Sequence, residues 1–110
     1  MTAIQLAKLA NFDIINEGNG NEKDIDGIFC CDLLSFAMAN MKKNSVWISV
    51  ISNINTIAVA MFTNVSCLII SHSIKISNDV LKKAKENNIC VLSSKLQTFE
   101  TSLIVHNLFA

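Results

Sequence analysis

The chain has 110 residues and a mass of 12.1 kDa, which fits a single domain over residues 1–110 and leaves no room for a second core. Hydrophobic residues make up 51% of the chain and charged residues 16%, a composition that excludes intrinsic disorder. The nine basic residues, all lysine, balance nine acidic residues. Without a basic face or arginine, the chain is not expected to bind nucleic acid.

The beginning of the chain predicts one helix followed by short strands. Thr2 and Gln5 have the spacing of a capping box, which predicts a short helix up to about Ala10. Residues 12–15 resemble a short strand, and the run NEGNGNEKD after them is typical of a surface turn. We expect this N-terminal helix and its neighbouring short strands to join an edge of the sheet that the later strands form.

The middle of the chain predicts two helices around a strand. Asp32 is expected to cap a helix that ends near Met41. Its predicted buried stripe is Leu33, Leu34, Ala37, Met38 and Met41. Residues 45–51 (SVWISVI) predict a strand with two apolar faces, typical of a sheet covered on both sides. Residues 55–62 (NTIAVAMF) predict a helix that is apolar nearly all round and must therefore be buried.

The last part of the chain continues the alternation of strands and helices. Residues 65–71 and 89–92 are predicted strands, and Ser77 or Asn78 caps the helix between them, whose lysines face water. The stripe expected for the closing helix is Leu96, Phe99, Leu103 and Asn107, with Ile104 and Leu108. This alternation predicts the α/β class: a three-layer sandwich with a mainly parallel sheet and helices on both faces.

The N-terminus and the longest uncharged segment predict a cytoplasmic protein outside the membrane. The N-terminus lacks the basic segment and continuous apolar run of a secretory signal. Residues 44–74 carry no formal charge, but Ser and Asn interrupt their apolar runs, so we interpret them as protein core and not as a membrane span.

The four cysteines predict neither a metal site nor a cofactor. They have no CxxC pair and no histidine at zinc-finger spacing. Cys67 and Cys90 lie within apolar runs and are expected to be buried as small hydrophobic residues. Cys30 and Cys31 point to different sides if their segment is extended, so one of them is expected to be exposed.

Polar residues follow three of the predicted parallel strands, where ligands of such sheets collect. These segments are residues 52–55, 71–73 and 93–95. The candidate ligand-binding residues are Ser52, Asn53, Asn55, Ser71, His72 and Ser73, whose side chains suit a phosphate or a nucleotide. The alternative is that the serines and asparagines only cap helices and that His72 is an ordinary surface histidine. No paired carboxylates, GxSxG or kinase loop are present, so no catalytic residue is assigned and no enzyme is expected.

Several segments together resemble the DRTGG domain family. They are GIFCCDLLSFAM (27–38), WISVISNINTIAVA (47–60), VSCLIIS (65–71), NDVLKKAKENNICVLSS (78–94) and the helix around Phe99 and Glu100. The resemblance covers almost the whole chain and is strongest to small stand-alone members from clostridia and related anaerobes. It implies a fold similar to the N-terminal domain of bacterial HPr kinase/phosphorylase.

The resemblance also carries functional expectations. Domains of this family occur within phosphotransacetylases and between the CBS domains of family II pyrophosphatases, where they are regulatory or dimer-forming. Stand-alone copies are often encoded beside iron-only hydrogenase or redox-related genes. The resemblance therefore implies a non-catalytic regulatory or protein-interaction domain, homodimeric and accessory to a redox or hydrogenase system.

This chain departs from the family pattern at two motifs. The family's Asp-Arg pair falls near Ser52 and Asn53 and its Thr-Gly-Gly near residues 71–73, and neither is retained. A bound anion would therefore lack the arginine as a partner. Cys31 stands where the small members have glycine before DLLS, which places a thiol beside a helix N-terminus.

Two alternative functions remain open beside protein contact. One is a module that senses a small ligand, an adenine nucleotide or phosphate, at the carboxyl ends of the parallel strands. The other is a redox sensor that uses the thiol of Cys30 or Cys31, with Cys31 as the candidate redox-active residue.

Overall fold

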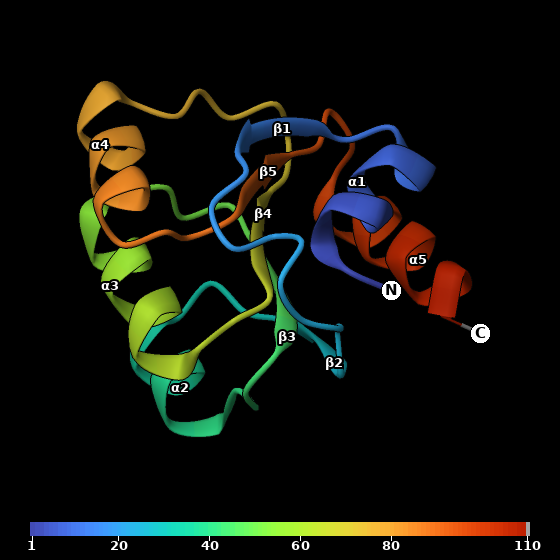
Figure 1. Ribbon diagram of the computed structural model, residues 1–110, viewed down its shortest axis with the longest axis horizontal. Helices are drawn as coiled ribbons and strands as arrows, with labels where there is room; N and C mark the ends of the chain where they lie inside the picture. Colours follow the sequence, from blue (N-terminus) through green and yellow to red (C-terminus); the bar gives the residue numbers. More distant parts are fainter. Residues whose placement is uncertain (110) are drawn as a thin grey trace.

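A computed structural model describes residues 1–109, which form five helices and five strands. In chain order the elements are α1 (Ala3–Ala10), β1 (Asp13–Asn16), β2 (Gly27–Cys30), α2 (Leu34–Asn40), β3 (Ser45–Ser49), α3 (Ile54–Thr63), β4 (Cys67–Ile70), α4 (Asn78–Glu86), β5 (Val91–Ser93) and α5 (Thr98–Phe109). Helices α1 and α5 cover one face of the sheet, and α2, α3 and α4 cover the other (Figure 1). The predicted three-layer α/β sandwich is confirmed.

The sheet is mainly parallel, with the strand order β1-β5-β4-β3-β2. Strands β2, β3, β4 and β5 are parallel, whereas β1 is antiparallel to β5. The N-terminal strands therefore join opposite edges of the sheet and do not share one edge as expected. The strand–helix–strand unit through α2 places β2 beside β3, whereas β1 has no helix crossover to a neighbouring strand and pairs antiparallel with β5.

Alternating side chains of the strands fill two separate apolar cores. Val46 and Ile48 of β3 lie in the core beneath α1 and α5, whereas Trp47 lies in the core beneath α2, α3 and α4. All three side chains are fully buried. The prediction of a strand with two apolar faces is confirmed, because helices cover the sheet on both sides.

Local hydrogen bonds begin two helices as predicted. The Thr2 hydroxyl accepts from the backbone N–H of Gln5 (3.3 Å) while the Gln5 side chain accepts from that of Thr2 (2.9 Å), which forms the capping box of α1. The Ser77 hydroxyl accepts from the N–H of Val80 and begins α4.

The predicted role of Asp32 as the cap of α2 is wrong. The helix begins at Leu34, and Leu33 stands at the cap position without a side-chain hydrogen bond. The Asp32 carboxylate instead accepts from the Ser49 hydroxyl (2.8 Å) and the N–H of Val50 (2.9 Å). These two hydrogen bonds tie the end of β2 to the end of β3. The Asp32 carboxylate thus serves the neighbouring strand end and not the first turn of α2.

The apolar stripes predicted for two helices include side chains that the structure exposes. On α2, Ala37 and the following Met41 are buried, but Leu33 and Met38 are exposed. On α3, the expectation of burial all round is wrong because Ile54, Ala58, Met61 and Phe62 are exposed. Within a single chain the sheet covers only one side of each of these helices, so their outer apolar side chains stay exposed.

The buried stripe predicted for α5 is also partly wrong. Ile104 and Leu108 pack against the core as expected, but Phe99 and Leu103 are exposed. Thr101 and Val105 are the fully buried residues of this helix. A buried hydrogen bond of 2.8 Å between the hydroxyls of Thr101 and Ser94 satisfies the Thr101 hydroxyl, which lies on the inner face of α5.

Candidate functional site

The carboxyl ends of the parallel strands form one edge of the sheet and carry the six candidate ligand residues. At the end of β3, Asn53 caps α3 by accepting from the N–H of Thr56 (3.1 Å). Asn55 is exposed in the first turn of α3. The Ser52 hydroxyl is buried and has no hydrogen-bond partner within residues 1–109. This part of the edge therefore begins a helix, and it exposes the side chains of Asn53 and Asn55 to solvent.

At the end of β4, Ser71 and His72 connect the sheet to the start of α5. The Ser71 hydroxyl is 2.8 Å from the Thr98 hydroxyl, and the His72 Nε2 accepts from the N–H of Thr98 (3.1 Å). The backbone N–H of His72 donates to the carbonyl of Leu96 (2.7 Å). Both candidate side chains thus hold α5 in place, a role that sequence analysis did not predict because Thr98 follows much later in the chain.

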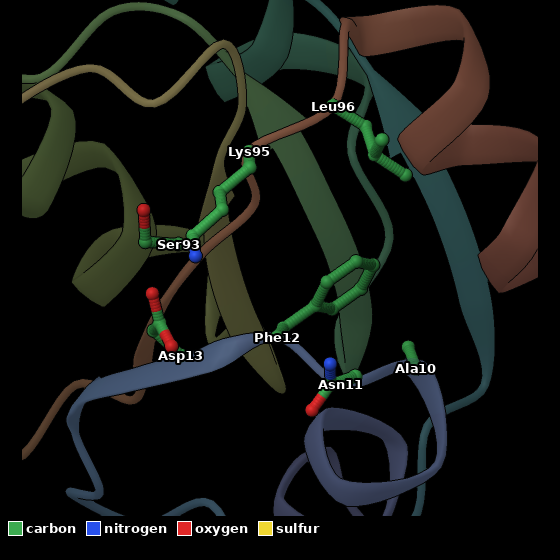
Figure 2. Close-up of a pocket in the computed structure, with 7 residues that line it drawn as sticks. All are labelled: Ala10, Asn11, Phe12, Asp13, Ser93, Lys95 and Leu96. Atoms are coloured by element: carbon green, nitrogen blue, oxygen red, sulfur yellow. The ribbon is translucent and has the colours of Figure 1, made fainter.

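Ser73 borders a pocket of about 360 Å³ between the β1 and β5 edge and the segment that leads into α4. Its lining residues are Asp13, Ile15, Ser73, Ile74, Lys75, Ile76, Ser93 and Lys95. A neighbouring pocket of about 270 Å³ is lined by Ala10, Asn11, Phe12, Asp13, Ser93, Lys95 and Leu96 (Figure 2). The two pockets share Asp13, Ser93 and Lys95, so we describe them together as the β1–β5 pocket.

The β1–β5 pocket carries two cationic groups and one acidic group. In Figure 2 the Lys95 side chain extends toward Ser93 and Asp13. In the described part of the chain, neither Lys95 nor Lys75 forms an ion pair with Asp13, and all three side chains are exposed. The excess of one positive charge favours an anion here, in a chain whose formal net charge is zero.

Sequence analysis identified residues 93–95 at this edge but missed Asp13 and Lys75. Asp13 reaches the site because β1 pairs antiparallel with β5, which sets Asp13 opposite Ser93. No local pattern in the sequence indicates this long-range pairing. Lys75 lies two residues after the candidate ligand-binding segment 71–73. That proximity is the one feature of the sequence that points to Lys75.

The two adjacent cysteines lie at the end of β2 with different exposure. Cys30 is exposed, as expected for one of the pair, and its sulfur is 3.1 Å from the Ser102 hydroxyl. Cys31 is half-buried, its thiol donates to the Leu33 carbonyl (3.4 Å), and its own carbonyl accepts from the Trp47 indole N–H (3.0 Å). Within residues 1–109 no three His, Cys, Asp or Glu side chains gather as a metal site would require.

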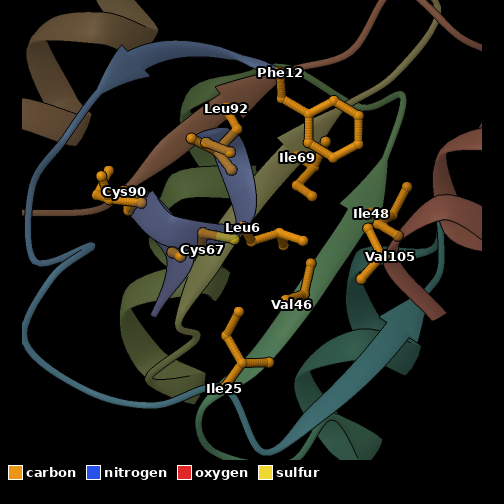
Figure 3. Close-up of a cluster of buried hydrophobic side chains, with 13 residues drawn as sticks. Leu6, Phe12, Ile25, Val46, Ile48, Cys67, Ile69, Cys90, Leu92 and Val105 are labelled. Atoms are coloured by element: carbon orange, nitrogen blue, oxygen red, sulfur yellow. The ribbon is translucent and has the colours of Figure 1, made fainter. Parts of the chain in front are cut away.

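Cys67 and Cys90 are buried, as predicted, among the side chains beneath α1 and α5 (Figure 3). A hydrogen bond with the Cys90 thiol and burial both raise the pKa of the Cys67 thiol well above its ordinary value. The neutral thiol is therefore the form that the folded chain stabilises.

This raised pKa predicts a loss of stability at alkaline pH. Above about pH 9 the Cys67 thiol ionises in the unfolded chain but stays protonated in the folded chain, so the free energy of unfolding falls as pH rises. One such thiol contributes a slope of at most about 1.4 kcal/mol per pH unit. Urea denaturation between pH 7 and pH 10 should therefore show a shallower decline for Cys67→Ala than for the unchanged chain. Parallel declines for the two proteins would contradict the assignment.

The fold and this edge define a class of protein: an α/β domain with polar residues and a shallow pocket at the carboxyl ends of a mainly parallel sheet. None of the helices within residues 1–109 combines the length and the hydropathy needed to cross a membrane. The DRTGG domain model matches residues 5–108, and the chain belongs to the DRTGG domain family. The resemblance seen in the sequence is thus confirmed.

A solved structure shares the fold. The chain is similar to the crystal structure of the CBS and DRTGG domains of the regulatory region of Clostridium perfringens pyrophosphatase, complexed with the activator diadenosine tetraphosphate. The TM-score is 0.79 at 15% sequence identity, and the match covers 94% of this chain. The chain spans 45% of the length of that solved chain. No curated protein matches the chain.

Proposed function

We propose that this chain is a non-catalytic regulatory domain that acts by protein contact, and that its first partner is a second copy of itself. The observation that carries the proposal is the outer face of α3, formed by Ile54, Ala58, Met61 and Phe62, which is exposed although it is almost entirely apolar. A helix that is apolar all round is normally buried on all sides. A partner that covers this face would complete the burial.

The helix next to α3 also exposes apolar side chains. Helix α2 packs against α3 and adds the exposed side chains of Leu33, at its cap position, and Phe36. The Phe36 ring stacks on Phe29 of the edge strand β2, with ring centroids 6.4 Å apart. We call these exposed side chains of α2 and α3 the α2–α3 face. Exposed apolar side chains that gather on two adjacent helices mark interaction sites.

A second copy of the chain fits this surface better than a charged partner does. A two-fold interface brings the same patch of each copy together, so an apolar patch meets an apolar patch. The formal net charge of zero adds no overall repulsion between copies. Charged side chains are absent from the exposed residues of α3, which lets its outer face lose water at low cost.

The similarity to a solved regulatory region supports a regulatory rather than a catalytic role. The resemblance to small stand-alone members supports an accessory role in a redox or hydrogenase system. The exposed Cys30 thiol and the half-buried Cys31 thiol are the groups that a redox partner would reach first.

The dimer proposal is tested with two matched phenylalanines on opposite faces of the sheet. Phe62 on α3 is 70% exposed and Phe99 on α5 is 71% exposed. Phe62→Glu should dissociate the dimer, because a carboxylate buried at a two-fold interface meets its own copy; an aromatic hot spot contributes about 2 kcal/mol or more. Phe99→Glu should leave the dimer intact. Light scattering at micromolar concentration measures both.

The stability of the monomer serves as the control for these two variants. Both side chains are exposed, so each substitution should change the free energy of unfolding of the monomer by no more than about 0.5 kcal/mol. Dissociation by Phe99→Glu and not by Phe62→Glu would show that the interface lies on the face of the sheet covered by α1 and α5. A monomeric unchanged chain would remove the dimer altogether.

Ligand sensing is a second candidate, favoured by the β1–β5 pocket. We propose that an adenine nucleotide or a phosphate binds at the carboxyl ends of the parallel strands, with Ser52, Asn53, Asn55, Ser71, His72 and Ser73 as candidate residues. The observation that supports it is the pocket of about 360 Å³ that Ser73 borders beside two lysines. Diadenosine tetraphosphate is the activator in the similar solved structure, which supports testing adenine nucleotides first.

A further inference from the structure

We propose that the β1–β5 pocket binds a nucleoside phosphate, with Lys75 and Lys95 holding the phosphate group and Asp13 the sugar hydroxyls. The proposal rests on the ligand-sensing candidate and assigns it a place and a ligand class. Of the six residues predicted from sequence, Ser73 alone belongs to this pocket. The site therefore lies beside the antiparallel pair of strands β1 and β5, away from Asn53 and Asn55.

The two lysines supply the attraction for a phosphate. Lys95 lies in both parts of the pocket and Lys75 in the larger part. Because neither forms an ion pair within residues 1–109, a phosphate would not have to displace a carboxylate from them. Lysine binds phosphate as a mobile point charge and suits an exposed site, where its side chain reorients toward the ligand.

Two serine hydroxyls add uncharged hydrogen-bond donors. Ser73 and Ser93 both line the larger part of the pocket. In the described chain neither hydroxyl takes part in an intramolecular hydrogen bond, in contrast to the hydroxyls of Ser71 and Ser94. These two donors are therefore available to phosphate oxygens.

The remaining lining residues indicate a ligand larger than a phosphate ion. The side chains of Ile15, Ile74 and Ile76 give the pocket an apolar wall, which a phosphate ion alone would leave uncovered. The Asp13 carboxylate repels phosphate but accepts hydrogen bonds from ribose hydroxyls, as acidic residues do in dinucleotide sites. The volume of about 360 Å³ lies within the range of small-molecule sites.

Calorimetric titration with ATP and with inorganic phosphate tests this proposal. The double variant Lys75→Gln/Lys95→Gln should raise the Kd for ATP at least about tenfold, because two cationic partners of the phosphates are lost. The matched control is Lys82→Gln/Lys85→Gln, which removes the same charge from the exposed face of α4 and should change the Kd less than about twofold. Asp13→Asn should weaken ATP binding but not phosphate binding.

The possible outcomes separate this pocket from the wider ligand hypothesis. An equal loss of ATP affinity in both double variants would show that ATP is held by general charge attraction. That result would overturn the assignment of the binding site to the β1–β5 pocket. ATP binding that the Lys75→Gln/Lys95→Gln variant leaves unchanged would overturn the pocket and leave ligand sensing at another place. No heat with ATP would overturn this inference while the dimer proposal stands. Thermal unfolding confirms that each variant is folded. Where a double variant does not fold, the two single lysine variants are titrated in its place.

Discussion

Replacing Trp47 with alanine is expected to lower the free energy of unfolding by about 3 to 5 kcal/mol. Trp47 is the largest fully buried side chain of the described residues, and it lies on β3 between the parallel strands β2 and β4. Alanine leaves a cavity under α2, α3 and α4, and it removes the indole N–H that donates to the Cys31 carbonyl (3.0 Å). Domains of this size have a total free energy of unfolding of about 5 to 15 kcal/mol, so this loss is a large fraction of it.

Trp47→Phe separates the cavity from the hydrogen bond. Phenylalanine keeps an aromatic ring in the core but cannot donate to Cys31, so its cost should be smaller and should come mainly from the unpaired carbonyl, about 1 to 3 kcal/mol. Urea denaturation followed by circular dichroism measures both variants, since the single tryptophan is lost as a fluorescent probe. A cost below about 1 kcal/mol for Trp47→Ala would contradict the packing described.

The second large effect is expected at Gly18, in the turn after β1. Gly18 has a φ of +49°, and a Cβ atom there would lie 2.6 Å from the carbonyl carbon of Ile89 and 2.7 Å from the carbonyl oxygen of Asn88. The left-handed conformation costs an alanine about 1 to 2 kcal/mol, and the approach to backbone atoms adds about 1 to 3 kcal/mol. Gly18→Ala should therefore destabilise the chain by about 2 to 5 kcal/mol.

Gly27→Ala is the matched control for this effect. Gly27 lies in β2, and the nearest atom to an added Cβ there is the Ser45 hydroxyl oxygen at 3.5 Å, an ordinary contact. Its substitution should change the free energy of unfolding by about 0.5 kcal/mol or less. Thermal or urea unfolding of the two variants provides the comparison. Equal stabilities of Gly18→Ala and Gly27→Ala would show that the turn does not hold Gly18 as described.

The layer arrangement could be predicted because local signals and hydrophobic pattern agree. Thr2 and Ser77 begin helices as expected, and the lysine-rich side of α4 identifies its solvent face without ambiguity. The continuous apolar strands predicted a sheet covered on both sides. These features depend on residues that lie close together in the sequence.

The misassigned residues depend on distant partners. Asp32 has the right position for a cap, but Ser49 and Val50 of the next strand end hold its carboxylate. On α3 and α5 apolar residues lie on both sides, so their pattern could not decide which side faces the sheet. Thr101, a polar residue, lies on the inner side of α5. The pocket at Asp13 follows from an antiparallel pairing that no local pattern encodes.

Sedimentation of the unchanged chain over a dilution series decides whether the α2–α3 face pairs two copies of the chain, because the mass in solution reports the pairing without any substitution. We expect a species of twice the 12.1 kDa chain mass at micromolar concentration, which dissociates on further dilution. A mass of a single chain at every concentration, up to the highest that stays in solution, would contradict it.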